Sequence, residues 1–203
     1  MKPCRCAKSG FTLVELMVAV SIALILLGVA GWSGQRALVA YRVSGAANEF
    51  VFFVRKATAI AARTNSRVAI IVDNNGPAEC NPSYRLQTIP VAGGTPVQYD
   101  RVCVNADFPG VALSSGAMAA AVTCPEEAAA SLPELTNCSM CTGTTSIFVF
   151  PTGAVATPED AGETLVFVPK HEAVTKQVLA VGIRNVSGKT RIYRPNGDAW
   201  ECP

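Results

Sequence analysis

The first long feature of the chain is an apolar run over residues 11–32. Its 22 residues, FTLVELMVAVSIALILLGVAGW, contain one charged group, Glu15. At about 1.5 Å per residue, a helix of this length crosses the hydrocarbon core of a bilayer. The short stretch before it is basic, which favours the cytoplasmic side for the amino terminus, although Arg36 and Arg42 beyond the run weaken that asymmetry. The pattern therefore predicts one membrane pass.

A second helical pattern follows the apolar run and extends to about residue 64. No proline occurs between Pro3 and Pro77, so the helix can continue without a break. Apolar residues recur at intervals of three and four, as on one face of an amphipathic helix. They are Leu38, Tyr41, Phe50, Phe53, Ala57 and Ile60. A helix over residues 11–64 would be about 80 Å long, and its amphipathic half, residues 33–66, should pack on a domain formed by the rest of the chain.

After Arg67 the helical period gives way to short runs rich in Val, Ile, Phe and Tyr. Turn-forming residues such as those at 73–76 and 187–188 separate the runs, a pattern typical of antiparallel strands. The runs cover residues 68–72, 84–89, 97–104, 147–150, 164–168, 178–186 and 190–194. The sequence therefore predicts an α+β fold, in which a long N-terminal α-helix packs on an antiparallel β-sheet domain at residues 67–203.

Composition excludes a disordered or strongly charged chain. Half of the residues are apolar and 16% are charged, against about 25% charged in an ordinary soluble domain. Three of the 17 basic residues lie in the first ten, which leaves 14 basic against 15 acidic residues in the body. The body is thus nearly neutral, and no bulk charge recruits nucleic acid or an anionic surface.

Glu15 is the residue that an ordinary secretory signal or a plain membrane anchor leaves unexplained. A carboxylate in the hydrocarbon core costs roughly 2.5–3.5 kcal/mol on insertion scales and is rarely retained without a partner. The segment KSGFTLVELMVAVSIALIL resembles the processing and assembly segment of type IV pilins and type II secretion pseudopilins. Glu15 lies inside that segment, so the resemblance gives the acid a role.

The resemblance implies a leader at residues 1–10 and cleavage after Gly10 by a prepilin peptidase, which also methylates the new terminus at Phe11. It further implies that Glu15 pairs with the amino group of Phe11 in a neighbouring subunit, so that a carboxylate and an ammonium neutralise each other in a setting of low dielectric constant. A conventional secretory signal would instead leave a mature chain that starts at Gly31.

The β domain carries a looser resemblance. Its strand order and the segment SIFVFPTGAV are similar to the domain shared by type II secretion pseudopilin H and the FimT/FimU-type minor pilins. This resemblance implies a minor pseudopilin in a periplasmic filament, anchored by one pass in the inner membrane and assembled with other pseudopilins or pilins. The alternative is a minor pilin that primes a type IV pilus or takes up DNA. A Cys-bearing, Ala-rich insertion at about residues 115–145 departs from the family pattern.

Six cysteines remain once a leader containing Cys4 and Cys6 is removed. An even number of cysteines exported to an oxidising compartment predicts disulfides, with 15 possible connectivities. The candidates are Cys80, Cys103, Cys124, Cys138, Cys141 and Cys202. We expect Cys124 to close the insertion onto Cys138 or Cys141. The last two also fit a redox or zinc pair, but no second CxxC accompanies them.

Other chemistry-bearing residues are sparse. The single histidine, His171, is as readily an exposed loop residue, and no Gly-rich phosphate loop or metal-spaced set of carboxylates appears. The sequence therefore predicts no enzymatic activity, no cofactor and no bound metal.

One basic hairpin stands out near the carboxyl terminus. If residues 187–188 close a two-residue turn, residue 184 faces 191 and residue 183 faces 192. Ile183 and Ile192 then share the buried face, while Arg184, Lys189 and Arg191 share the other and Arg194 lies close by. A similar motif occurs in FimT-type pilins that take up DNA, which implies contact with DNA phosphate. The alternatives are a solvated basic face and contact with an acidic neighbouring subunit.

Overall fold

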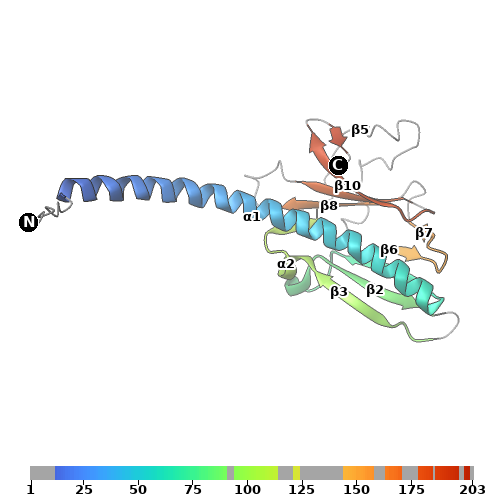
Figure 1. Cartoon of the computed structure of the whole chain (residues 1–203). Helices are drawn as coiled ribbons and strands as arrows, with labels where there is room; N and C mark the ends of the chain where they lie inside the picture. The colour runs from blue at the N-terminus through green and yellow to red at the C-terminus, as the bar shows by residue number, and fades with distance from the viewer. Residues whose placement is uncertain are drawn as a thin grey trace, which may run out of the picture. The chain divides into compact units, whose positions relative to one another are not determined.

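The computed structural model describes residues 12–90, 94–113, 121–123, 144–157, 163–170, 178–184, 186–196 and 199–201. Contacts divide the chain into two units, residues 1–38 and 39–203, and the long helix α1 (Leu13–Thr64) contributes to both. In the second unit α1 packs against two β-sheets (Figure 1), which confirms the predicted α+β fold. The helix covers 52 residues without interruption, as the absence of proline predicts.

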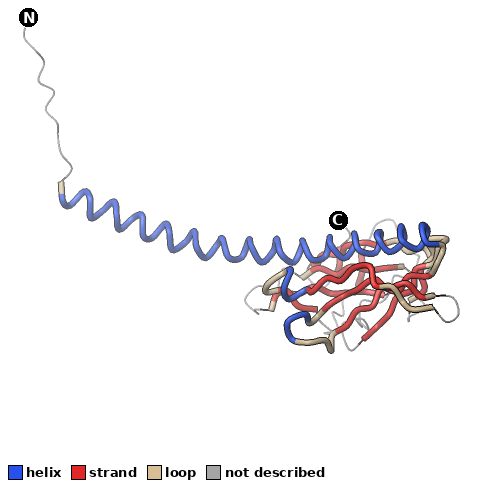
Figure 2. Tube along the Cα trace, turned by 90° about the horizontal axis from the view of Figure 1, so that it is seen from below, coloured by secondary structure: helices blue, strands red, loops and turns tan. Residues whose placement is uncertain are grey.

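The part of α1 in the second unit buries one face in the core. Figure 2 shows it running along the strands of the domain. The buried residues recur at helical intervals and are Val43, Ala46, Ala47, Phe50, Phe53, Val54, Ala57 and Ala61. Tyr41 was expected in this stripe but is 79% exposed. It precedes Val43 by two residues, or about 200° around the helix, so it points away from the core.

The first sheet has five strands in the order β3-β2-β1-β6-β7, and all of its pairs are antiparallel. The strands are β1 (Arg67–Asp73), β2 (Ser83–Ile89), β3 (Gln98–Cys103), β6 (Thr144–Val149) and β7 (Val155–Ala156). Alternate residues of β1 and β2, among them Ile70, Tyr84 and Leu86, are fully buried. This alternation gives the sheet one face toward α1 and one face away from it.

The second sheet has six strands in the order β4-β8-β9-β10-β11-β5. They are β4 (Val111–Leu113), β5 (Ala121–Thr123), β8 (Glu163–Pro169), β9 (Leu179–Ile183), β10 (Thr190–Asn196) and β11 (Ala199–Glu201). The β5/β11 pair is parallel, which the antiparallel prediction did not include. A parallel pair needs a long connection, and the chain between Thr123 and Ala199 supplies one. Strand β5 lies in the predicted insertion, most of which lies outside the described residues.

Aromatic rings join α1 to both sheets. Phe50 and Phe53 meet the ring of Tyr84 on β2 edge to face, with centroids 5.1 and 4.7 Å apart. Phe50 also lies 6.1 Å from Phe167 on β8. Two short elements, η1 (Ala78–Cys80) and α2 (Val104–Asp107), complete the domain beside β2 and β3.

The hairpin between β9 and β10 differs from the predicted two-residue turn. Ile183 pairs with Thr190, and the Arg184 N–H donates to the Lys189 carbonyl at 3.0 Å, so four residues separate the paired positions. The cause lies outside the hairpin. Val186, at a φ of 67°, exchanges two backbone hydrogen bonds with Val155, of 2.7 and 3.3 Å. It therefore pairs with β7 instead of extending β9, and the register shifts by two residues.

Candidate functional site

The start of α1 is organised around Glu15 and Thr12. The backbone N–H and the hydroxyl of Thr12 each donate to Oε2 of Glu15 at 3.0 Å, and the Glu15 N–H donates back to the Thr12 hydroxyl at 3.3 Å. This is a capping box, in which residues three apart satisfy N–H groups that the first turn leaves without helical partners. Thr12 was not singled out from the sequence, although the pattern Thr-x-x-Glu before an apolar run predicts this arrangement.

The helix that follows is apolar on all sides. A window of α1 has a mean hydropathy of 2.6 and is long enough and apolar enough to cross a membrane. None of that window is buried, and large side chains such as Leu13, Ile25 and Leu27 are 67–73% exposed. An apolar surface of this extent requires lipid or another protein. Glu15 is the one charged residue in it.

The capping box satisfies hydrogen bonds at Glu15 but supplies no positive charge. The donors in its three bonds are two backbone amides and one hydroxyl, which are neutral. A carboxylate in apolar surroundings still needs a cation to offset the loss of hydration. Gly10 and Phe11, the expected cleavage and methylation residues, lie outside the described residues.

Comparison with known proteins bears on this same segment. Residues 5–31 match the prokaryotic N-terminal methylation motif. The motif indicates a type IV pilin-like protein that a prepilin peptidase processes, that a single apolar helix anchors in the membrane and that assembles with other pilins. The match leaves the β domain uncovered. No curated protein and no solved structure matches the chain.

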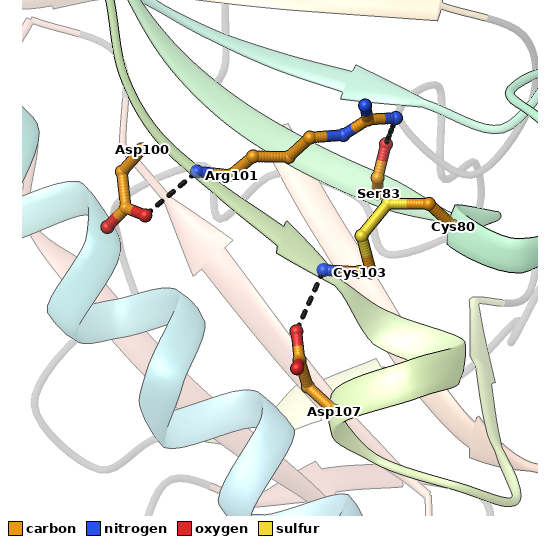
Figure 3. The surroundings of a disulfide bond; sticks show 6 residues. All are labelled: Cys80, Ser83, Asp100, Arg101, Cys103 and Asp107. Atoms are coloured by element: carbon orange, nitrogen blue, oxygen red, sulfur yellow. Dashed lines mark hydrogen bonds between the residues drawn. A yellow bond between two sulfur atoms is a disulfide. The ribbon is translucent and has the colours of Figure 1, made fainter.

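A disulfide joins Cys80, at the end of η1, to Cys103, at the end of β3 (Figure 3). The two residues are 23 apart in sequence, and their Cα atoms are 4.6 Å apart. The bond therefore ties the connection between β1 and β2 to the edge strand of the first sheet. The other candidate cysteines, including the CxxC pair and the expected partners of Cys124, lie outside the described residues; they are Cys124, Cys138, Cys141 and Cys202.

The structure keeps the three basic residues expected on one face of the hairpin together, although in a shifted register. Arg184 lies opposite Lys189, and Arg191 lies opposite Gly182, so these three basic residues share a face. Strand alternation places Arg194 on the other face of β10. The shared face also carries the buried ring of Tyr193, which is 3% exposed. This face of the hairpin is therefore partly buried.

Metal-binding arrangements do not occur in the part of the chain that the structure describes, where no group of three or more His, Cys, Asp or Glu residues could hold an ion. Asp73, the acidic residue at the end of β1, instead accepts hydrogen bonds from neighbouring residues. Oδ1 of Asp73 accepts from the Asn75 N–H at 3.0 Å and from the Thr144 hydroxyl at 3.2 Å. His171 lies outside the described residues.

Proposed function

We propose that this chain is a minor pseudopilin, a structural subunit of the periplasmic filament of a type II secretion system. The observation that carries the proposal is the methylation motif over residues 5–31, which is followed by an uninterrupted helix packed on a β domain. In this proposal the peptidase cuts after Gly10 and methylates Phe11. The fold and the motif favour a structural subunit over an enzyme.

The proposed assembly contact is the pairing of Glu15 with the amino group of Phe11 in a neighbouring subunit. Its support is physical. The capping box positions the Glu15 carboxylate at the first turn of α1, and the apolar surface around it makes an unpaired charge costly, by roughly 2.5–3.5 kcal/mol on insertion scales. A neighbouring ammonium removes that cost, so the contact can fix the position at which each new subunit is added to the filament.

The proposed topology assigns residues 1–10 to the leader, 11–32 to the membrane pass, 33–66 to the amphipathic helix and 67–203 to the periplasm. The Cys80–Cys103 disulfide supports the last assignment, because structural disulfides persist in oxidising compartments. The partners in this proposal are the peptidase and the sister subunits of the filament.

The alternative is a FimU/FimT-type minor pilin of a type IV pilus. The same motif and helix serve both roles, so the genes beside this one discriminate them. A secretion ATPase, a secretin and sister pseudopilins favour the secretion role, whereas retraction and competence genes favour the pilus. Co-purification of the mature chain with one set of sister subunits would give the same discrimination at the protein level.

Mass spectrometry of the mature chain tests the processing step. We expect an amino terminus at Phe11 that carries one methyl group. A mature chain that starts at Gly31 would identify a conventional secretory signal and end the proposal.

Three substitutions of Glu15 separate its charge from its capping hydrogen bonds. Glu15→Gln keeps an oxygen acceptor for the Thr12 N–H but loses the charge, whereas Glu15→Ala loses both and Glu15→Asp keeps the charge. We expect Gln and Ala to abolish incorporation into the filament and Asp to retain part of it. Met17→Ala, in the same segment, is the control that should incorporate normally. Normal incorporation of Glu15→Gln would assign Glu15 a capping role alone.

A further inference from the structure

Two arginines lie directly opposite each other on the face of the first sheet that points away from α1. Arg85 on β2 pairs with Arg101 on β3, and on its other side it faces Ile71 of β1. The Val104 N–H donates to the Pro82 carbonyl at 2.9 Å, so these two residues form a hydrogen-bonded pair. The two kinds of pair alternate along antiparallel strands, and Arg85 and Arg101, three pairs further along, therefore form a non-hydrogen-bonded pair. Side chains approach most closely in such pairs, and like charges in them destabilise a sheet.

Neither guanidinium is neutralised by the described residues. Arg101 donates from Nη2 to the neutral Ser83 hydroxyl at 3.4 Å (Figure 3), and Nε of Arg85 is buried with no hydrogen-bond partner among the described residues. No acidic side chain in the described part of the chain forms an ion pair with either arginine. Asp73 lies two residues beyond Ile71 on β1 and is therefore diagonal to Arg85. Its Oδ1 already accepts hydrogen bonds from other residues. Among the described residues the pair therefore has donors without an acceptor and no ion pair that neutralises it.

The backbone beside this pair is closed to an added strand. Strand β3 is at the edge of the sheet, and the N–H groups of Arg101 and Cys103 point outward from it. Each is taken by a carboxylate, at 2.8 Å by Oδ1 of Asp100 and at 2.9 Å by Oδ2 of Asp107 (Figure 3). An incoming strand would find these donors occupied. The two N–H donors nearest the arginine pair are therefore taken, and the arginine side chains supply the donors at this place.

We propose that Arg85 and Arg101 form a binding site for a single carboxylate on an acidic side chain of a partner protein. The two oxygens of one carboxylate can accept from two guanidinium groups, and its charge relieves the repulsion between two arginines on directly opposed residues. A single carboxylate brings one charge to the two guanidinium groups, whereas a polyanion such as DNA would bring further phosphates close to Asp73, which lies on the same face. The site is independent of the proposed filament role, since it requires only a partner that presents an acid.

The test uses the full chain in detergent micelles, labelled with ¹⁵N at arginine, and follows the Nε–H resonances by NMR. The probe is the peptide acetyl-Ala-Glu-Ala-amide, and the matched control peptide carries Gln in place of Glu. A third arm uses a short DNA duplex, and ionic strength is held constant. We expect saturating shifts of Arg85 and Arg101 with the Glu peptide alone. Arg67, exposed on the same face but opposite Ile89, should not shift.

Conservative variants distinguish binding by two planar guanidinium groups from binding by positive charge alone. Arg85→Lys and Arg101→Lys keep the charge but lose the planar donors, so the saturating shift of the remaining arginine should be lost in each. Unchanged resonances of the other arginines would show that each variant is folded. Equal shifts with the Gln peptide, equal shifts at Arg67 or no saturation would overturn the proposal. A stronger response to DNA would replace it with nucleic-acid binding.

Discussion

Tyr84 presents the sharpest stability prediction, because its side chain places a hydroxyl in the core. The side chain is fully buried, and its oxygen has no hydrogen-bond partner among the described residues. Leaving a buried polar group unsatisfied costs about 1–3 kcal/mol. The ring itself packs well, with Phe50 and Phe53 edge to face on it. Tyr84→Phe keeps both ring contacts and removes the unsatisfied group.

We expect Tyr84→Phe to stabilise the domain by about 1 kcal/mol, the lower end of that cost, because the removed oxygen leaves a small gap. For a chain of this size the change corresponds to a rise in Tm of about 2–4 °C. Urea and thermal unfolding of the full chain in detergent measure it. Tyr99→Phe is the matched control, since that residue is 41% exposed and should change stability by less than about 0.5 kcal/mol. Destabilisation by Tyr84→Phe would show that the hydroxyl has a partner, and the reasoning would fail.

The same burial makes the stability depend on pH in the alkaline range. Burial, with smaller contributions from Glu49, Asp107 and Asp100, raises the pKa of Tyr84 above its ordinary value of 10.0. Above pH 10 the unfolded chain therefore releases the Tyr84 proton while the folded chain holds it, and stability is lost at up to about 1.4 kcal/mol per pH unit. The stability gap between Tyr84→Phe and the native chain should widen as the pH rises past 10. A constant gap from pH 9 to 11 would contradict the buried position of the hydroxyl.

Three further predictions concern the disulfide, a buried glycine and the basic hairpin. Replacing Cys80 and Cys103 together by Ser should lower the free energy of unfolding by about 3 kcal/mol, from the entropy of a closed loop of this length, and a loss below about 1 kcal/mol would count against a structural bond. Gly182→Ala should cost about 1–3 kcal/mol, because its Cβ would lie 2.8 Å from Cε2 of Tyr193; Gly76→Ala, with no atom nearer than 3.6 Å, is the control. If the hairpin contacts DNA, Lys189→Glu with Arg191→Glu should weaken a low-salt gel shift, and unchanged affinity would end that proposal.

Local rules predicted the helix and most strands. An uninterrupted stretch without proline gave α1 to within two residues at its start. Short runs rich in Val, Ile, Phe and Tyr gave β1 and β2 to within one residue at each end. These features depend on neighbours in the chain, so a single sequence contains the information. The exposed position of Tyr41 was missed because an apolar residue near the stripe was assigned to it without regard to its angle on the helix.

The features that local rules missed depend on distant residues. The hairpin register follows from the bonds between Val186 and Val155, which belong to different parts of the second unit. The opposition of Arg85 and Arg101 follows from the pairing of β2 with β3, whose register shifts between Leu86 and Gln87. A shift of one residue would have turned every side chain to the other face. Neither arginine therefore has a recognisable role before its partner strand is placed.

Carboxylates accept from backbone N–H groups in both units of the chain, yet the consequences differ. Asp107 accepts from Cys103 at the exposed edge of a sheet, where water stabilises the remaining charge, so the bond can be structural and nothing more. Glu15 accepts from Thr12 with similar geometry, but it does so at the start of a helix whose surface is apolar on every side. A neutral glutamine would satisfy the same N–H there without the cost of a charge. Capping therefore accounts for an oxygen at position 15 but does not require an acid, and the proposed pairing with the amino group of another subunit would account for the acid.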